Sequence, residues 1–160
     1  MTESREGGCA CGAVRYRLDA APMFVHCCHC RDCQRQTGSA FVINALIETD
    51  RIAALGAAPE PVPVPVPTDS GRPHRIFRCP TCWTAVWSEY GGRAVLRFVR
   101  AGTLDEPASL SPDVHIYVRS KLPWVTLPDG VPAFEEYYDA KLLWPSASLE
   151  RRRAASPPRG

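Results

Sequence analysis

The sequence predicts a mainly β fold built from short antiparallel strands and hairpins, with little helix. Short segments alternate apolar and polar residues with the period of two that a strand with one buried face requires. Between them lie many of the 16 prolines and 11 glycines, and the eight cysteines lie in three clusters. A chain of 160 residues has the length of one domain. We expect this domain to span residues 1–144 and a disordered basic tail to span residues 145–160.

Three segments in the first third of the chain are predicted strands. Residues 12–18 (GAVRYRL) alternate, residues 23–27 (MFVHC) form a short apolar run, and residues 40–47 (AFVINALI) are rich in β-branched residues. The polar stretch 30–39 (CRDCQRQTGS) resembles a turn and is compatible with one helical turn closed by Gly38.

Alternating prolines fill residues 59–68 (PEPVPVPVPT). Because proline has no backbone N–H, this segment is predicted to be neither a helix nor a central strand. We expect an extended, polyproline-type connection or a sheet edge. It is either an exposed connection between two hairpin arms or a ligand for an aromatic groove on a partner.

The second half continues the strand pattern. Residues 76–89 predict a hairpin with CPTC (79–82) at its turn, and residues 93–102 and 113–120 predict two more strands. The best helical period lies in residues 133–143 (AFEEYYDAKLL). The polar tail carries Arg151, Arg152 and Arg153, which we expect either to be solvated or to contact nucleic acid or anionic lipid.

Composition and charge exclude several classes of protein. The net charge of +2 comes from the tail, so the body is close to neutral and lacks the basic surface of a nucleic-acid-binding protein. No apolar run reaches the roughly 20 residues of a membrane helix, and the charged N-terminus lacks a secretory signal. We therefore expect a cytoplasmic protein that binds neither nucleic acid nor membrane; its oligomeric state stays open. Clustered thiols in a reducing compartment favour metal ligation over disulfides.

Two cysteine pairs are predicted to form one closed structural zinc site. Cys9 and Cys11 supply two sulfurs, and Cys79 and Cys82, in a C-P-x-C knuckle, supply two more. Structural zinc takes four ligands, usually cysteine sulfurs, in a tetrahedron. Because the two pairs lie far apart in the chain, the metal would join the N-terminal strand to a distant hairpin and contribute to folding.

The middle cluster is predicted to form a different, catalytic site. In an extended segment Cys28 and Cys30 point to one side and His29 to the other, and Cys33 can reach back through a turn. Cys27 lies opposite Cys28, so three thiolates and one open position remain, as in catalytic zinc sites. The alternative is a second structural zinc completed by His29, Cys27 or another ligand; we expect His29 to be a packing residue.

Three thiolates on a zinc ion leave a net charge of −1. Such a site suits a soft fourth ligand such as a substrate thiol, which is deprotonated when bound to a metal. Arg31, Arg35 and Gln36 lie beside this cluster and are either solvated or available to substrate carboxylates.

The motifs GCACG (8–12), CHCRDC (28–33) and FRCPTC (77–82) occur in the order that is typical of one family. TGS (37–39), GTLD (102–105) and HIYV (115–118) extend the match, which covers residues 7 to about 125. On these motifs the chain resembles the glutathione-dependent formaldehyde-activating enzyme family, also described through the centromere protein V domain.

The resemblance implies a zinc-binding β-tent fold with two zinc ions per chain. It implies a structural zinc on Cys9, Cys11, Cys79 and Cys82 and a catalytic zinc on Cys28, Cys30 and Cys33. It also implies a carbon–sulfur lyase that forms or cleaves S-hydroxymethylglutathione from glutathione and formaldehyde, or a related thiol adduct.

Two residues depart from the family pattern. Trp83 stands where the family usually has glycine, so the knuckle either adopts a different turn or tolerates positive φ at a cost of about 1 kcal/mol. Cys27 is an additional thiol, which can pair oxidatively with a neighbour if zinc is lost. Two other functions stay open: a non-catalytic, zinc-stapled interaction module, and a sensor or carrier of metal or thiols.

Overall fold

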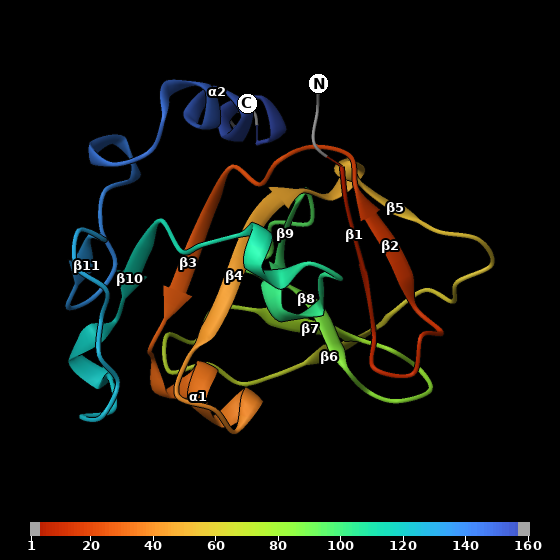
Figure 1. Cartoon of the computed structure of the whole chain (residues 1–160), viewed down its shortest axis with the longest axis horizontal. Helices are drawn as coiled ribbons and strands as arrows, with labels where there is room; N and C mark the ends of the chain where they lie inside the picture. The colour runs from red at the N-terminus through yellow and green to blue at the C-terminus, as the bar shows by residue number, and fades with distance from the viewer. Residues whose placement is uncertain (1–3, 157–160) are drawn as a thin grey trace.

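The computed structural model describes residues 4–156 and confirms a mainly β fold (Figure 1). The described residues form one sheet of three strands and one of eight. The small sheet has the order β1-β2-β5 and is antiparallel throughout. Its strands are β1 (Arg5–Gly8), β2 (Arg15–Leu18) and β5 (Ile52–Ala54).

The large sheet has the order β11-β10-β3-β4-β9-β8-β7-β6. It confirms the predicted strands near residues 23–27, 40–47, 76–89, 93–102 and 113–120. The strands are β3 (Phe24–Cys28), β4 (Val42–Glu48), β6 (Val62–Pro65), β7 (His74–Arg78), β8 (Ala85–Tyr90), β9 (Leu96–Arg100), β10 (Val114–Ile116) and β11 (Ala133–Phe134).

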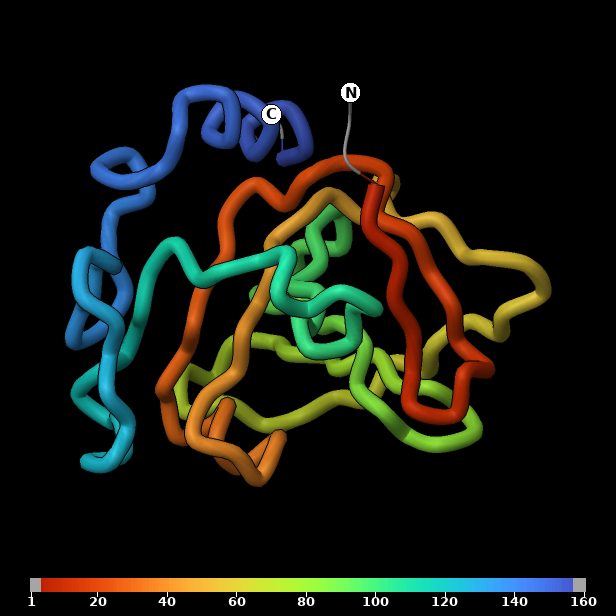
Figure 2. Tube along the Cα trace, viewed as in Figure 1, coloured from red at the N-terminus to blue at the C-terminus, as the bar shows by residue number. Residues whose placement is uncertain are grey.

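One edge of the large sheet is parallel, contrary to the expectation of antiparallel strands only. β10 pairs in parallel with both β3 and β11. Parallel neighbours need a long crossover. Here the chain after β9 first passes the small sheet, where Leu104 pairs with Gly7, before it returns beside β3. Figure 2 shows this segment next to the N-terminal hairpin and residues 121–144 along the outer edge of β10, before the chain crosses above β3 and β4 as α2.

The proline-rich segment forms the opposite edge of the large sheet, as predicted. β6 pairs only with β7. Val66, just beyond β6, donates its N–H to the carbonyl of His74 (3.0 Å). Since successive residues of a strand point their backbone groups to opposite sides, the prolines at 61, 63, 65 and 67 occupy the outward positions, where no N–H is needed.

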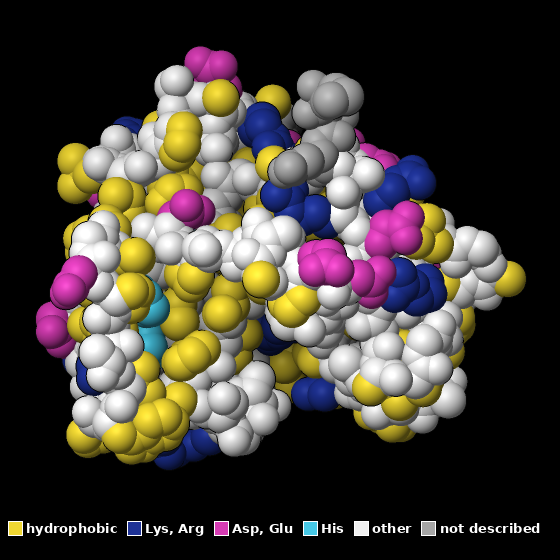
Figure 3. Space-filling model, viewed as in Figure 1, with side chains coloured by type: hydrophobic (Ala, Val, Ile, Leu, Met, Phe, Trp, Pro, Cys, Tyr) yellow, Lys and Arg dark blue, Asp and Glu magenta, His cyan; other side chains and the backbone are white. Residues whose placement is uncertain are grey.

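Two hydrophobic clusters border the two groups of cysteines. One contains Phe24, Leu46 and Trp144 and includes Cys28 and Cys33. The other contains Tyr16 and Val99 and, among its further members, Cys9 and Cys79. The middle cysteines and the outer cysteines therefore belong to separate parts of the core. In Figure 3, hydrophobic side chains lie over β3, β4 and β10, whereas charged side chains gather over β1 and β2.

The predicted helical turn after the middle cysteines is α1 (Arg31–Thr37). The Cys30 side chain accepts a hydrogen bond from the Cys33 N–H at its start, and Gly38 ends it with a left-handed φ of 64°. Five short 3-10 turns connect other described elements: Thr49–Arg51, Ala101–Thr103, Pro107–Ser109, Val118–Ser120 and Ala140–Leu142.

The prediction of a helix over residues 133–143 is wrong. This segment contains the two-residue strand β11 and the 3-10 turn Ala140–Leu142. The stacking of Tyr138 on the adjacent Tyr137, with ring centroids 4.9 Å apart, favours the extended path, because adjacent side chains of a helix point in different directions. The ring of Tyr138 also stacks on Phe134. Its hydroxyl also joins His26 Nε2 (2.8 Å) and accepts from Trp144 Nε1 (2.7 Å).

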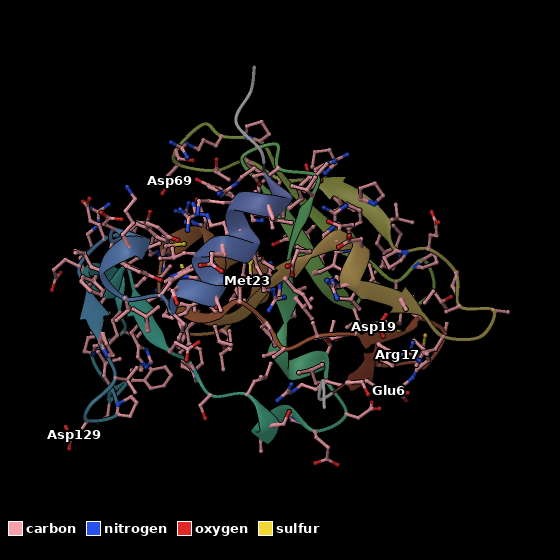
Figure 4. All side chains as sticks on the ribbon, turned by 90° about the horizontal axis from the view of Figure 1, so that it is seen from above. Glu6, Arg17, Asp19, Met23, Asp69 and Asp129 are labelled. Carbon is pink, nitrogen blue, oxygen red and sulfur yellow. The ribbon has the colours of Figure 1, made fainter. Side chains whose placement is uncertain are left out.

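The prediction of a disordered tail is wrong for most of its length. Residues Ser146–Ala155 form helix α2, and residues 157–160 lie outside the described part. Polar contacts hold α2 on the body: Ser148 Oγ donates to the Met23 carbonyl (2.7 Å), and Arg151 pairs with Glu48 (2.6 Å). Figure 4 shows α2 beside the labelled Met23. None of the described helices is long and apolar enough to span a membrane.

Candidate metal centres

The four outer cysteines converge from two turns. Cys9 and Cys11 lie in the connection between β1 and β2, Cys79 follows β7, and Cys82 lies in the turn before β8. Their sulfurs lie within 4.8 Å of one another, with Cys9 Sγ 3.5 Å and Cys79 Sγ 3.8 Å from Cys11 Sγ. In a tetrahedron with Zn–S bonds of about 2.3 Å, sulfurs are about 3.8 Å apart. The four sulfurs therefore fit a zinc ion.

Backbone and hydroxyl donors surround these sulfurs. Cys79 Sγ accepts from the N–H groups of Thr81 (3.4 Å) and Cys82 (3.5 Å). Desolvation raises the pKa of Cys79, but these N–H groups outweigh it and lower the pKa. Hydrogen bonds from Thr84 lower the pKa of Cys82 to about 5. The donors favour thiolates, which are the form that binds a metal.

The knuckle tolerates a strained residue. Trp83 has a φ of 61°, in the left-handed region that favours glycine. The knuckle therefore tolerates a positive φ at this residue and does not adopt a different turn. The N–H of Trp83 donates to the Cys79 carbonyl (3.0 Å), and its own carbonyl accepts from Arg78 Nη1 (3.0 Å). The side chain is 55% exposed. The turn is therefore fixed by backbone hydrogen bonds and does not depend on what the indole contacts.

The three middle cysteines also converge. Cys28 ends β3, Cys30 caps α1, and Cys33 lies in its first turn. Their sulfurs lie within 4.8 Å of one another, and no fourth histidine, cysteine or carboxylate in residues 4–156 joins them. A short strand that runs directly into a helix thus brings the residues at positions 28, 30 and 33 to one point, as the spacing predicts.

The charges of these three thiols depend on one another. Hydrogen bonds from Cys28 and Cys33 lower the pKa of Cys30 to about 2. The same hydrogen bond with Cys30 raises the pKa of Cys28. The hydrogen bonds among these sulfurs therefore favour the thiolate at Cys30. A bound cation would supply the positive charge that three thiolates require, so this donor set also fits zinc.

A buried arginine lies near the same cluster, and sequence reasoning missed it. Arg100, on β9, is 7% exposed and donates to Asn44 Oδ1 on β4, while its Nε has no hydrogen-bond partner. Burial lowers the pKa of Arg100, and the sulfurs of Cys33 and Cys28 raise it. The guanidinium is therefore a counter-charge for this cluster. The only signal in the sequence was a charged residue in an apolar strand.

Cys27 and His29 point away from the three sulfurs, as predicted, and meet a third residue. Cys27 Sγ lies 3.6 Å from His29 Nε2, which lies 2.9 Å from His115 Nδ1. All three side chains are buried, and their ligand atoms lie close enough together to hold a metal ion. Gln34 Nε2 donates to the His29 carbonyl (2.8 Å) and so fixes this part of the loop.

Arg31 and Gln36 of α1 have partners within the protein, whereas Arg35 has none among the described residues. Arg31 Nη1 donates to Gln34 Oε1, and Gln36 Nε2 lies 3.3 Å from His74 Nδ1. Arg35 is exposed. Of the three side chains that were considered for substrate carboxylates, only Arg35 has no recorded partner among the described residues.

Comparison with known proteins agrees with this geometry. The family model described as glutathione-dependent formaldehyde-activating enzyme matches residues 4–120, which include all three cysteine clusters. The chain belongs to this family. Residues 121–156, which include α2, lie outside the part of the chain that matches the glutathione-dependent formaldehyde-activating enzymes.

Two individual proteins are similar to the chain. A protein of Halomonas elongata, provisionally named a glutathione-dependent formaldehyde-activating enzyme, is 27% identical over 125 residues, which cover 76% of this chain and 80% of the relative. A crystal structure of a Rhodobacter sphaeroides protein has 18% identity and a TM-score of 0.46, covering 67% of this chain and 91% of the other.

Proposed function

We propose that the chain is a zinc-dependent carbon–sulfur lyase of the glutathione-dependent formaldehyde-activating type. The observation that carries the proposal is the convergence of Cys28, Cys30 and Cys33 without a fourth protein ligand in the described part of the chain. The reaction is the reversible formation of S-hydroxymethylglutathione from glutathione and formaldehyde, or of a related thiol adduct. Family membership supports glutathione and formaldehyde as the reactants.

The reaction joins a sulfur to a carbonyl carbon. The S–H proton leaves the thiol, the sulfur forms a bond to the formaldehyde carbon, the C=O π bond breaks, and the oxygen takes up a proton from water. Zinc held by three thiolates would supply an affinity for a soft ligand, which keeps a substrate thiol deprotonated at neutral pH.

The protein's own residues have two tasks in this proposal. Cys28, Cys30 and Cys33 would hold the metal at the junction of β3 and α1. With zinc bound, the three thiolates would leave a net negative charge, and Arg100 would offset part of it when a substrate thiolate binds. Its unpartnered Nε is a donor that is already desolvated. Because water does not screen a buried cation strongly, this counter-charge is effective at the site.

A second zinc on Cys9, Cys11, Cys79 and Cys82 belongs to the proposal as a structural ion, so we expect two zinc ions per chain. All eight cysteines are free thiols in the structure. Zinc–thiolate sites require reduced cysteines, and for this reason we place the protein in the cytoplasm.

The test measures metal content and turnover together. We expect two zinc ions per purified chain and faster exchange between ¹³C-formaldehyde and S-hydroxymethylglutathione, followed by NMR, than in buffer alone. Cys30→Ser should reduce this exchange to the uncatalysed rate and leave the melting temperature within a few degrees. Cys27→Ala, which changes a neighbouring buried thiol, should retain exchange. An active Cys30→Ser protein contradicts the proposal. One zinc ion per chain without turnover would instead support the interaction module.

A further inference from the structure

A groove lies between α2 and the preceding turn, and all of its lining residues except Arg93 lie outside the family match. It has a volume of about 640 Å³, in the range of small-molecule sites. Residues from three places line it: Arg93 from the turn before β9, Tyr137 and Lys141 from the segment after β11, and Arg152 and Arg153 from α2. One side of the groove is therefore formed by α2, the helix that replaces the expected disordered tail.

The groove is strongly cationic. Arg93, Lys141, Arg152 and Arg153 contribute four positive charges, and Asp139 is the only acidic residue among the described residues that line the groove. Within residues 4–156, none of these four cations has a recorded ion pair with a carboxylate. In Figure 4, side chains that end in nitrogen gather beside α2 on the side of the preceding turn.

Contacts within the protein balance only part of this positive charge. Arg152 lies 5.2 Å from the centroid of the Trp144 ring, a cation–π contact, and Arg93 Nε donates to the Tyr90 carbonyl (3.2 Å). Cations in the last turn of a helix also interact favourably with its dipole. Repulsion nevertheless remains: burial lowers the pKa of Arg93, and the charge of Arg152 lowers it further. An anion would relieve this repulsion.

Two neighbouring tyrosines connect the groove with the surroundings of the three-sulfur cluster. Tyr138, on the wall of the groove, belongs to the same hydrophobic cluster as Cys28 and Cys33. Its neighbour Tyr137 stacks on it and lies within electrostatic range of both Arg152 and Cys28. A ligand with its thiol at the sulfurs and a carboxylate in the groove would therefore run past Tyr137. An extended tripeptide spans roughly 10 Å.

We propose that this groove binds the carboxylates of the thiol substrate. The proposal deepens the proposed function: it rests on a thiol substrate at Cys28, Cys30 and Cys33, and it selects thiols that carry carboxylates remote from the sulfur. Arg93 and Arg152 are the specificity-determining residues, because guanidinium groups bind carboxylates through two parallel hydrogen bonds. A thiol of similar size without these carboxylates is then a poor ligand.

The test separates binding from turnover. The probe is S-methylglutathione, which has both carboxylates but no thiol, and binding is followed by the tryptophan fluorescence of the protein or by calorimetry. Its diethyl ester, in which both carboxylates are blocked, should bind at least about tenfold more weakly, as expected for the loss of a charge-assisted hydrogen bond. Equal Kd values for the acid and the ester would overturn the proposal.

Variants locate the site. Arg93→Gln and Arg152→Gln should each weaken S-methylglutathione binding about tenfold, Arg152→Lys should lose less, and Arg17→Gln, on β2 and paired with Asp19, should match the unaltered protein. Melting temperatures show that each variant is folded. If Arg152→Gln fails to fold, Arg93→Gln decides alone.

Failure of this inference and failure of the proposed function give different results. Turnover of glutathione with an unaltered KM in folded Arg93→Gln and Arg152→Gln proteins would refute the groove and leave the enzyme. Tight, carboxylate-dependent binding of S-methylglutathione without any turnover would refute the enzyme and leave the groove.

Discussion

At the scale of single residues, we expect the loss of one sulfur atom to affect stability differently in the two thiol clusters. Cys79 is fully buried, accepts two backbone hydrogen bonds and completes a four-sulfur set that joins β1–β2 to β7–β8. We expect Cys79→Ser to cost on the order of 3 kcal/mol, or roughly 10 °C in melting temperature, because a closed metal site contributes its binding energy to folding.

Calorimetry and metal analysis check this expectation, with Cys27→Ala as the matched control. Cys27 is buried to a similar degree but lies outside the four-sulfur set. The zinc content of Cys79→Ser should fall by about half. A melting temperature equal to that of the unaltered protein would contradict the structural role of this sulfur.

Sequence predicts single residues well where the chemistry is local. Cys28, Cys30 and Cys33 converge within one strand–helix junction, so their spacing was sufficient. The two distant pairs, Cys9–Cys11 and Cys79–Cys82, were predicted to lie together because a zinc ion takes four ligands. Arg100 and His115 were not predicted, because their roles depend on β9 and β10 lying beside the strands that carry Asn44 and Cys27. Such pairings are tertiary contacts without a local signal.

At the scale of elements, an ion pair is one of the contacts that hold α2 on the body. Arg151 donates to both oxygens of Glu48 (2.8 and 2.6 Å) and to the Ala21 carbonyl (2.9 Å). We expect Arg151→Ala to cost about 1 kcal/mol at neutral pH, since both side chains are partly shielded from water. Arg119→Ala, which removes an exposed ion pair with Glu136, should cost less. Thermal melts measure both.

The contribution of this pair should disappear in acid. Burial alone would raise the pKa of Glu48, but hydrogen bonds from Arg151 outweigh it, and Arg51 helps to lower the pKa below 4.5. A lowered carboxyl pKa stabilises the fold above the unfolded-state pKa, and this stabilisation is lost as the pH falls through the folded-state pKa. The difference in melting temperature between Arg151→Ala and the unaltered protein should therefore be full at pH 6 and shrink below pH 4. A constant difference would show that the pair is not the cause.

The errors in element prediction have a common physical origin. α2 contacts the body through Ser148 and an arginine–glutamate pair. A helix is usually predicted from a stripe of apolar residues, so this polar sequence resembled a disordered tail. Residues 133–143 have helical spacing, but tyrosine stacking and the hydroxyl contacts of Tyr138 stabilise an extended path. In both places tertiary contacts outweigh local propensity.

At the scale of the whole molecule, the two thiol clusters should respond differently to metal removal. The three-sulfur cluster has one protein ligand fewer than the four-sulfur cluster and lies in a separate part of the core. We expect a chelator to remove zinc from it first, so that turnover is lost while the melting temperature is nearly unchanged. Unfolding should follow only when the second ion leaves, and zinc should restore turnover after the first stage. Simultaneous loss of turnover and fold would contradict this order.

The proline-rich edge strand β6 limits the pairing of the large sheet with strands of other chains. Along β6 the outward positions offer carbonyl groups but no N–H donors, so a strand from another chain finds only half of the hydrogen bonds that it needs. Without these prolines the exposed edge strand would be a template for intermolecular β-pairing and fibre growth. The same residues that make this segment a poor strand in the sequence thus protect the folded protein against aggregation at this edge.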